Sequence, residues 1–233
     1  MKIICFGDSL TRGITFVKGR MRILKDNYPS VLGKLTESIS GIEILNKGVF
    51  NDNSDFLVNR LEKDVLAENP DAVLISVGGN DCNFKWEEVA LEPDGNHQPI
   101  VPLDRYLENM SFMVREFQTR HITPYLLTLP PLDPTRYYRS IADRYGPSIG
   151  HFVSFVGGIE HWHGMYNRRL KMLAKELNVA LIDVRSFIKS AGDLNLLISD
   201  DGIHLTREGY LKMSQAVLEN LKKQQLIPEP LKS

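Results

Sequence analysis

Ser9 stands directly after the first apolar run of the chain, in the segment Phe6–Gly13, which reads Phe-Gly-Asp-Ser-Leu-Thr-Arg-Gly. The glycines on both sides of the serine permit tight turns, and side chains at the carboxyl end of a strand face the ligand-binding edge of an open α/β sheet. A serine in that position can attack an acyl carbon when a base accepts its proton. The same segment is also typical of an ordinary turn or of a helix cap.

Asp201 and His204 form a second candidate pair near the other end of the chain, in the run Asp-Gly-Ile-His-Leu-Thr. Thr206, two residues after the histidine, is typical of a helix cap. A local turn at this spacing can bring the carboxylate against the imidazole, so that the aspartate orients the ring and the other ring nitrogen accepts a serine proton. On its own the motif also fits a surface turn with a solvated histidine.

A third turn, Val77–Asp81, has the sequence Val-Gly-Gly-Asn-Asp. Its glycines expose backbone N–H groups, and the side chain of Asn80 adds another donor. Donors of this kind hold the negative oxygen of a tetrahedral intermediate in acyl transfer, although Gly-Gly-Asn-Asp also makes a good turn. Together, the three turns predict a nucleophile, a base with its orienting carboxylate, and an oxyanion donor.

Short apolar runs predict the strands that position these turns. Each run is rich in Ile, Val and Leu without alternation, as in parallel strands covered on both faces. The runs are Lys2–Phe6, Ile42–Asn46, Ala72–Val77, Pro124–Leu129 and Val179–Val184. Between them, apolar residues at helical spacing predict core-facing helices over 106–117, 166–177 and 210–221.

Strands that alternate with helices favour a three-layer α/β/α sandwich, in which a parallel sheet has helices on both faces. We expect a flavodoxin-like five-stranded sheet in the order 2-1-3-4-5. In this order the first and third strands are neighbours, so Ser9 and Asn80 would meet at one crevice. The loop Asp201–His204 follows the fifth strand and can return to the same edge of the sheet.

With the three turns in this order, the chain resembles the GDSL, or SGNH, hydrolase family. Phe6–Gly13 is similar to the family's GDSL block, Val77–Asp81 to the block with the oxyanion asparagine, and Asp201–His204 to its Asp-x-x-His block. The resemblance spans residues 7 to 204. It implies an SGNH hydrolase fold, the hydrolysis of esters or thioesters by Ser9, Asp201 and His204, and no metal cofactor.

One block departs from the family's pattern. The family usually has Asn-x-Gly-x-x-Gly after the second strand, and the later glycine gives an oxyanion N–H. Here the run is Asn-Lys-Gly48-Val-Phe-Asn51, so an asparagine replaces that glycine. Because asparagine tolerates a positive φ, the resemblance still implies that the Asn51 N–H is an oxyanion donor beside those of Ser9 and Asn80. Gly48 is a further candidate donor.

Length and charge limit the domain organisation and the classes of binding partner. The 233 residues fit one domain, which we place at 1–225, with long loops at 83–104 and 130–164 and a C-terminal tail at 226–233. The net charge of −1 gives no general attraction to nucleic acid or anionic membranes. No apolar run is long enough for a signal peptide or a membrane span, so we expect a cytoplasmic protein. Cys5 and Cys82 alone do not make a disulfide framework.

Other residues have simpler interpretations. We expect Asp8 to brace the turn at the nucleophile and Arg12 to pair with Asp8. His151, His161 and His163, with only Glu160 nearby, are too few ligands to predict a metal site. Four aromatic residues between the fourth and fifth runs could either line a substrate pocket or pack the long loop onto the domain. They are Phe152, Phe155, Trp162 and Tyr166.

The sequence therefore favours a serine esterase that hydrolyses carboxylic esters through an acyl-enzyme on Ser9, with a small-molecule ester as its substrate. A short-chain or acetylated carbohydrate ester fits best, because no long apolar segment suggests a lid that engages lipids. Two alternatives stay open. One is an acyltransferase that uses the same triad, and the other is a non-catalytic carbohydrate-binding protein on the same fold. The oligomeric state is unknown from the sequence.

Overall fold

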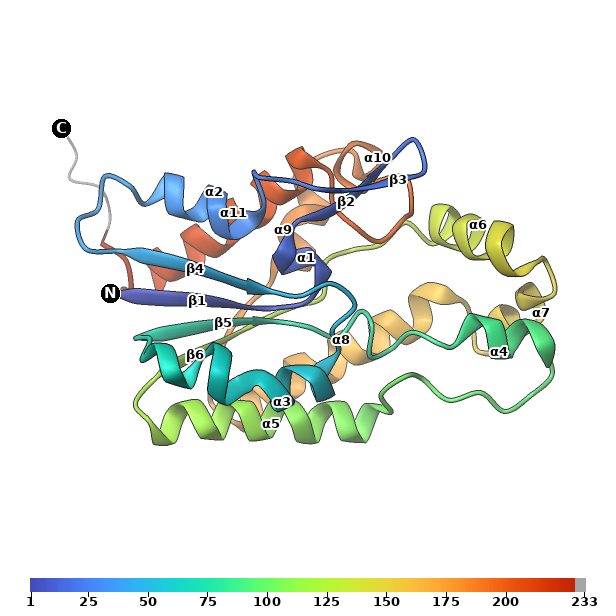
Figure 1. Ribbon diagram of the computed structural model, residues 1–233, viewed down its shortest axis with the longest axis horizontal. Coiled ribbons are helices and arrows are strands. Elements are labelled where there is room, and N and C mark those ends of the chain that lie inside the picture. Colours follow the sequence, from blue (N-terminus) through green and yellow to red (C-terminus); the bar gives the residue numbers. More distant parts are fainter. Residues whose placement is uncertain (229–233) are drawn as a thin grey trace.

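Parallel strands form the central sheet of the protein, and the computed structural model describes residues 1–228 (Figure 1). The strands are β1 (Lys2–Gly7), β4 (Glu43–Gly48), β5 (Ala72–Ser76), β6 (Thr123–Leu127) and β7 (Ala180–Ile182). They lie in the order β4-β1-β5-β6-β7, and each neighbouring pair is parallel. Counted along the chain, these five strands have the order 2-1-3-4-5, so the predicted three-layer α/β/α fold is confirmed.

The fifth predicted strand is longer than the observed strand at both ends. It was expected to extend over Val179–Val184, but β7 ends at Ile182 because the next residue, Asp183, caps a helix that begins at Val184. The side chain of Asp183 accepts a hydrogen bond from Ser186 N and caps α9 (Val184–Ser190). An apolar run thus contains both the end of a strand and the start of a helix, which periodicity alone does not separate.

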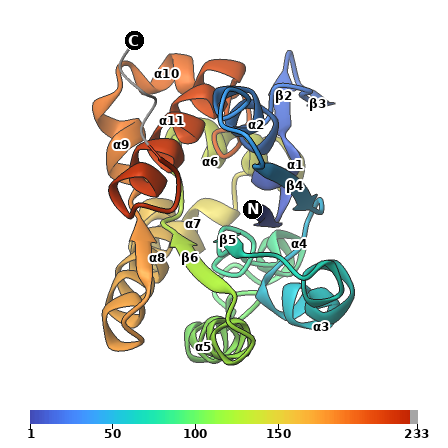
Figure 2. The same cartoon turned by 90° about the vertical axis from the view of Figure 1, so that its left-hand side faces the viewer.

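Helices cover both faces of the sheet, as the end-on view in Figure 2 shows. One face carries α3 (Ser54–Asp64), α5 (Leu103–Thr119) and α8 (Ile159–Glu176). The other face carries α2 (Tyr28–Leu35), α9 and α11 (Arg207–Lys223). Three short helical segments lie near the ends of strands and helices: α1 (Ser9–Arg12), the 3₁₀ turn η1 (Leu66–Glu68) and α10 (Leu194–Leu197).

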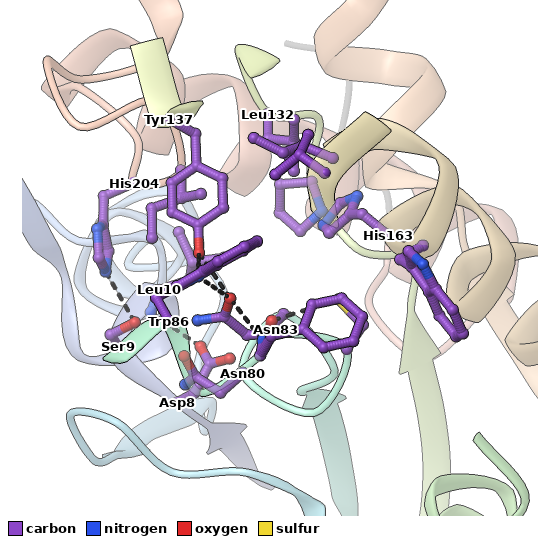
Figure 3. Close-up of a pocket in the computed structure, with 18 of the residues that line it drawn as sticks. Asp8, Ser9, Leu10, Asn80, Asn83, Trp86, Leu132, Tyr137, His163 and His204 are labelled. Carbon is purple, nitrogen blue, oxygen red and sulfur yellow. Dashed lines mark hydrogen bonds between the residues drawn. The ribbon is translucent and has the colours of Figure 1, made fainter. Parts of the chain in front are cut away.

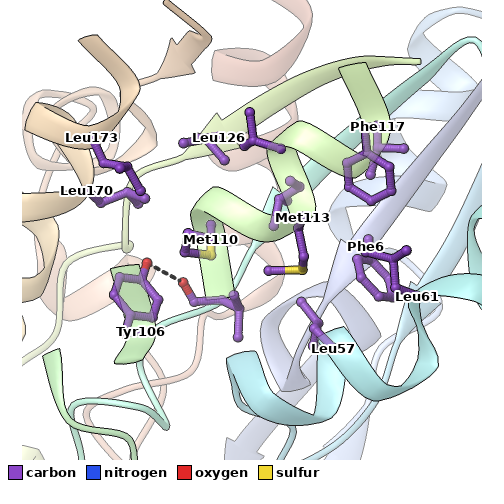
Figure 4. Packing of buried hydrophobic residues seen from close by; sticks show 14 of the residues in the cluster. Phe6, Leu57, Leu61, Tyr106, Met110, Met113, Phe117, Leu126, Leu170 and Leu173 are labelled. Atoms are coloured by element: carbon purple, nitrogen blue, oxygen red, sulfur yellow. Dashed lines mark hydrogen bonds between the residues drawn. The ribbon is translucent and has the colours of Figure 1, made fainter. Parts of the chain in front are cut away.

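Strand β1 is buried from both sides, and its side chains alternate between two cores. Ile4 and Phe6 pack against α3, α5 and α8, whereas Ile3 and Cys5 pack against α2, α9 and α11. The three predicted helical stripes are buried in these cores, as expected from their spacing. Figure 4 shows the first core, where Met113 and Phe117 of α5 lie near Phe6 of β1 and near Leu57 and Leu61 of α3.

The long segments 83–104 and 130–164 are not plain loops, so that prediction is wrong. They contain α4 (Trp86–Leu91), α6 (Pro134–Tyr145), α7 (Ile149–Phe155) and the start of α8. Asp133 caps α6, with a proline in its first turn. These helices lie beyond the carboxyl ends of the strands (Figure 1) and share a third apolar core. We call this unit, residues 83–164 without α5 and β6, the helical cap.

A short hairpin was also missed. Strands β2 (Ile14–Val17) and β3 (Arg20–Ile23) are antiparallel and joined by Lys18 and Gly19, both with positive φ (51° and 70°), as two-residue hairpins require. At the other end, the predicted tail 226–233 begins inside the domain, because Ile227 is buried against the second core. Residues 229–233 of that tail lie outside the described residues.

Candidate active site

The structure brings the three candidate catalytic side chains together. Oγ of Ser9 lies 2.9 Å from Nε2 of His204, and Nδ1 of the same ring lies 2.5 Å from Oδ2 of Asp201 (Figure 3). Ser9 is the first residue of α1, directly after β1, and the helix is capped by Asp8, whose side chain accepts a hydrogen bond from Leu10 N. The nucleophile position therefore lies at the carboxyl edge of the sheet.

The loop that carries the other two residues is held by its own hydrogen bonds. Oδ1 of Asp201 accepts from the Ser199 hydroxyl at 2.7 Å and from the His204 N–H at 3.2 Å, and Ser199 N donates to His204 O. Burial raises the pKa of Asp201, but the hydrogen bonds from His204 and Ser199 outweigh it, and the net pKa lies below its usual value. This carboxylate stays ionised and can stabilise an imidazolium.

This loop contacts two segments that the sequence did not predict. The ring of Phe16, on the hairpin strand β2, lies 5.5 Å from the His204 ring, centroid to centroid. From the helical cap, Asp133 N donates to Gly202 O at 2.8 Å. Gly202 has φ 82°, and a Cβ there would lie 2.3 Å from Tyr137 N. This glycine, inside the predicted motif, is the only local signal of the close contact.

Three of the predicted oxyanion donors, Ser9, Asn51 and Asn80, have an N–H group that is free to bind a ligand. Nδ2 of Asn80 donates one hydrogen to the backbone oxygen of Asp52 at 2.7 Å, which orients the amide and leaves its second hydrogen for a ligand. Asn51 adopts φ 64°, the left-handed conformation expected for an asparagine that replaces glycine. Among residues 1–228, no hydrogen bond uses the backbone N–H of Ser9 or Asn51, so both are free to donate.

Gly48 is not available as an oxyanion donor, and that prediction is wrong. Its N–H donates to Oδ1 of Asn46 at 2.8 Å. A Cβ at this position would lie 2.2 Å from the backbone nitrogen of Arg12. The glycine instead lets the end of β4 approach the backbone of α1, which carries Ser9.

Buried carboxyl groups brace the turns around the nucleophile. Asp8 is buried, and burial raises its pKa to about 7 despite the hydrogen bond from Leu10 N and the nearby His204. Burial likewise raises the pKa of Asp81 to about 6, against the opposing hydrogen bonds from Ser54. The expected pair of Asp8 with Arg12 is wrong: within the described part of the chain no ion pair joins them, and Arg12 is exposed.

A pocket with largely apolar walls opens at Ser9, Asn80 and His204. The helical cap supplies most of its lining, and Ile203 and Leu10 complete the wall. The main apolar lining residues of the cap are Phe84, Trp86, Leu132, Tyr137, Val153, Val156, Ile159 and Trp162. Of the four aromatic residues considered for a pocket, only Trp162 lines it. Phe152 and Tyr166 are buried in cores and Phe155 is exposed.

The histidines of the cap do not gather into a metal site. His151 pairs with Asp94 at the surface, and His163 contacts Arg185. Among the described residues, no group of three or more His, Cys, Asp or Glu side chains could hold a metal ion. Cys5 and Cys82 are free thiols in different cores. In the same part of the chain, no helix combines the length and apolar character needed to cross a lipid bilayer.

Comparison with known proteins identifies the family of this chain. The sequence model of the GDSL-like lipase/acylhydrolase family matches residues 5–212. The chain belongs to this family. This GDSL-family chain is 28% identical over 218 residues to the uncharacterized lipoprotein YqeF of Bacillus subtilis, covering 89% of this chain and 84% of the relative.

Two other relatives are less similar in sequence. An isoamyl acetate-hydrolyzing esterase 1 homolog of Mus musculus is 26% identical, covering 89% of this chain and 76% of the relative. An acetylxylan esterase of Geobacillus stearothermophilus is 24% identical, covering 94% of this chain and 93% of the relative. The crystal structure of that acetylxylan esterase superposes with a TM-score of 0.66 at 22% identity, over 94% of this chain and 93% of the other, which supports the GDSL-hydrolase fold.

Proposed function

We propose that this GDSL-family hydrolase is a serine esterase that cleaves carboxylic esters through an acyl-enzyme on Ser9. One observation carries the proposal: a hydrogen-bonded chain runs from Asp201 through His204 to Ser9, at 2.5 and 2.9 Å, and Ser9 lines a pocket with largely apolar walls. Such a chain supplies a nucleophile, its general base and the carboxylate that orients the base.

The reaction follows from these positions. His204 takes the proton of Ser9 through Nε2 while Oγ attacks the ester carbonyl carbon. The negative oxygen of the tetrahedral intermediate accepts hydrogen bonds from the backbone N–H groups of Ser9 and Asn51 and from Nδ2 of Asn80. His204 then returns the proton to the leaving alcohol, and water, activated by the same ring, releases the acid.

The substrate class is a short-chain ester, such as an acetate ester of an alcohol or a sugar. The relatives support this choice, since one is described as an isoamyl acetate-hydrolyzing esterase homolog and one as an acetylxylan esterase. The pocket also favours a small substrate, because aromatic and aliphatic side chains of the helical cap line the space beside Ser9.

Ester hydrolysis by wild type and by Ser9→Ala tests the proposal. We expect wild type to hydrolyse p-nitrophenyl acetate and butyrate faster than octanoate, and Ser9→Ala to lose roughly 10⁴-fold or more of kcat. Ser190→Ala, which changes an exposed serine on α9, serves as the matched control and should keep wild-type rates. Equal turnover by wild type and Ser9→Ala would exclude the proposed mechanism. Product analysis with added alcohols separates hydrolysis from acyl transfer.

A further inference from the structure

His163 lines the same pocket as Ser9 and His204 but takes no part in the proposed chemistry. It lies on α8, and only 8% of the residue is exposed. In Figure 3 it lies on the side of the pocket opposite Ser9 and His204. A buried histidine in a largely apolar wall needs a physical reason, since an unpaired buried polar group destabilises the fold.

Arg185 fixes the hydrogen of this imidazole on one nitrogen. Nη1 of Arg185 lies 3.0 Å from Nδ1 of His163. A guanidinium can only donate, so Nδ1 is the acceptor and the ring hydrogen must be on Nε2. The guanidinium is itself held, because it also donates to Pro130 O at 3.2 Å and to Glu160 at 2.9 Å.

The ring stays neutral as well as fixed. Burial lowers the pKa of His163 to about 3, and the positive charges of Arg185 and Lys189 act in the same direction. A neutral ring with Nδ1 occupied has a single free polar atom, the Nε2–H donor. Within residues 1–228, no protein group forms a hydrogen bond with Nε2, and the residue borders the pocket. This donor is therefore available to a ligand.

Asn83 adds a second donor to the same wall. Its Oδ1 accepts hydrogen bonds from Tyr137 Oη at 2.7 Å, Trp86 Nε1 at 2.8 Å and Phe84 N at 2.9 Å. Because three donors occupy that oxygen, the amide orientation is fixed and Nδ2 is the atom left to face the pocket. Two donors with fixed orientation in one wall suit a ligand that brings acceptor oxygens.

We propose that His163 is a specificity-determining residue whose Nε2–H binds an acceptor oxygen in the acyl or alcohol part of the substrate. The pocket then prefers an ester group with an ether, hydroxyl or carbonyl oxygen over a hydrocarbon group of equal size. This inference rests on the proposed function, because it names the substrate class that the same site selects. Arg185 is its positioning residue, since it determines which nitrogen of His163 carries the hydrogen.

Two pairs of isosteric esters test the preference. p-Nitrophenyl methoxyacetate and p-nitrophenyl butyrate differ by one ether oxygen in the acyl group. 2-Methoxyethyl acetate and butyl acetate differ by one ether oxygen in the alcohol. For each pair, the ratio of kcat/KM for the oxygenated ester to that for the hydrocarbon ester is measured in wild type and variants. Comparing ratios between proteins removes the intrinsic reactivity of each ester.

His163→Phe should lower this ratio roughly threefold to tenfold for at least one pair, the loss expected for one neutral hydrogen bond. His163→Gln keeps an N–H donor near the same position and should retain most of the preference. His161→Phe, an exposed neighbour on α8 that lies outside the pocket, should leave both ratios unchanged. Unchanged ratios in His163→Phe for both pairs would overturn the proposal.

Nitrogen-15 NMR of the histidine rings tests the mechanism of positioning. We expect the spectrum of wild type to show His163 as the neutral Nε2–H tautomer, and Arg185→Met to show a mixture of tautomers. A wild-type Nδ1–H tautomer would overturn the proposal. The activity of Ser9→Ala on p-nitrophenyl butyrate separates the proposed esterase mechanism from the proposed role of His163. If Ser9 is essential but substitution of His163 leaves the ester ratios unchanged, only the inference about specificity fails.

Discussion

Oγ of Ser9 and Nε2 of His204 lie 2.9 Å apart, although 195 positions separate the two residues in the chain. The parallel sheet makes this possible, because β1 and the loop after α10 both reach the carboxyl edge where ligands bind in such folds. Phe16 of the hairpin and Asp133 of the helical cap also contact the loop that carries His204. The arrangement makes specific predictions for each contact.

Asp201→Asn should keep the fold and lose about 10³–10⁴-fold of kcat for p-nitrophenyl butyrate. An amide in place of the carboxylate can stabilise the wrong tautomer of His204 and no longer balances an imidazolium. Asp200→Asn changes the exposed neighbouring carboxylate, which accepts a hydrogen bond from Lys18 N, and should retain activity. Similar kinetics for the two variants would remove Asp201 from the mechanism.

Asn80→Ala should lower kcat by about 10²–10³-fold with little change in KM, as expected when a donor acts mainly on the transition state. The loss of the hydrogen bond to Asp52 O should change thermal stability only slightly, because the amide is partly exposed. Steady-state kinetics and a melting curve on the same preparation check both statements. Wild-type kcat in Asn80→Ala would show that this amide does not hold the oxyanion.

The backbone of Asn51 is predicted to matter more than its side chain. Asn51→Gly retains the left-handed φ of 64° without strain and should keep most of the activity. In Asn51→Val, a β-branched residue resists this conformation by roughly 1–2 kcal/mol, which would displace the N–H and reduce kcat about tenfold. If Asn51→Gly were the less active of the two, the side chain rather than the backbone would carry the function.

Gly48→Ala should be strongly destabilising because its Cβ would lie 2.2 Å from Arg12 N, where only backbone movement could relieve the clash. Overpacking of this kind costs roughly 1–3 kcal/mol or more in unfolding free energy. Gly33→Ala is the matched control, since a Cβ there meets nothing closer than 3.9 Å and the residue lies within α2. Urea melts should show Gly33→Ala at least as stable as wild type. Equal stability of both variants would contradict the close approach.

Asp8 should make wild type less stable as the pH rises. Burial raises its pKa from 3.8 to about 7, so between these values the folded state holds a proton that the unfolded state has released. Stability therefore falls through this window as the pH increases. Asp8→Asn keeps an oxygen to accept from Leu10 N and cannot ionise. The melting temperature of Asp8→Asn should therefore rise relative to that of wild type between pH 4 and pH 7. A difference in melting temperature that stays constant over this range would show that Asp8 ionises normally.

Much of the site could be predicted from the sequence because its chemistry lies in short local motifs. Ser9, Asn80 and the Asp201–His204 pair each follow a strand or precede a helix that apolar periodicity identifies. The alternation of strands and helices predicted a parallel sheet, and the strand order was the one expected for a flavodoxin-like fold. The positive φ of Asn51 was expected because this asparagine replaces a glycine of the family's pattern and is among the few residues that tolerate such a backbone.

What the sequence could not predict depends on contacts between distant segments. The assignment of Gly48 as an oxyanion donor is an exception, because its N–H donates to the side chain of Asn46, only two residues earlier in the same run. The hairpin β2–β3 has two strands of four residues each, too short for a clear pattern. In the helical cap, aromatic residues alternate with turns. Its helices are stabilised by a core that residues from several of its segments form together. The contact between His163 and Arg185 joins α8 to α9 and has no local signal.

Labelling with a serine-reactive fluorophosphonate, read by intact mass and peptide mapping, tests the central claim most directly. The arrangement predicts one adduct per chain on Ser9 in wild type, none in Ser9→Ala, and much slower labelling in His204→Ala, because the hydroxyl then lacks its base. An adduct on another residue, or equal labelling of wild type and Ser9→Ala, would contradict the assignment of Ser9 as the nucleophile.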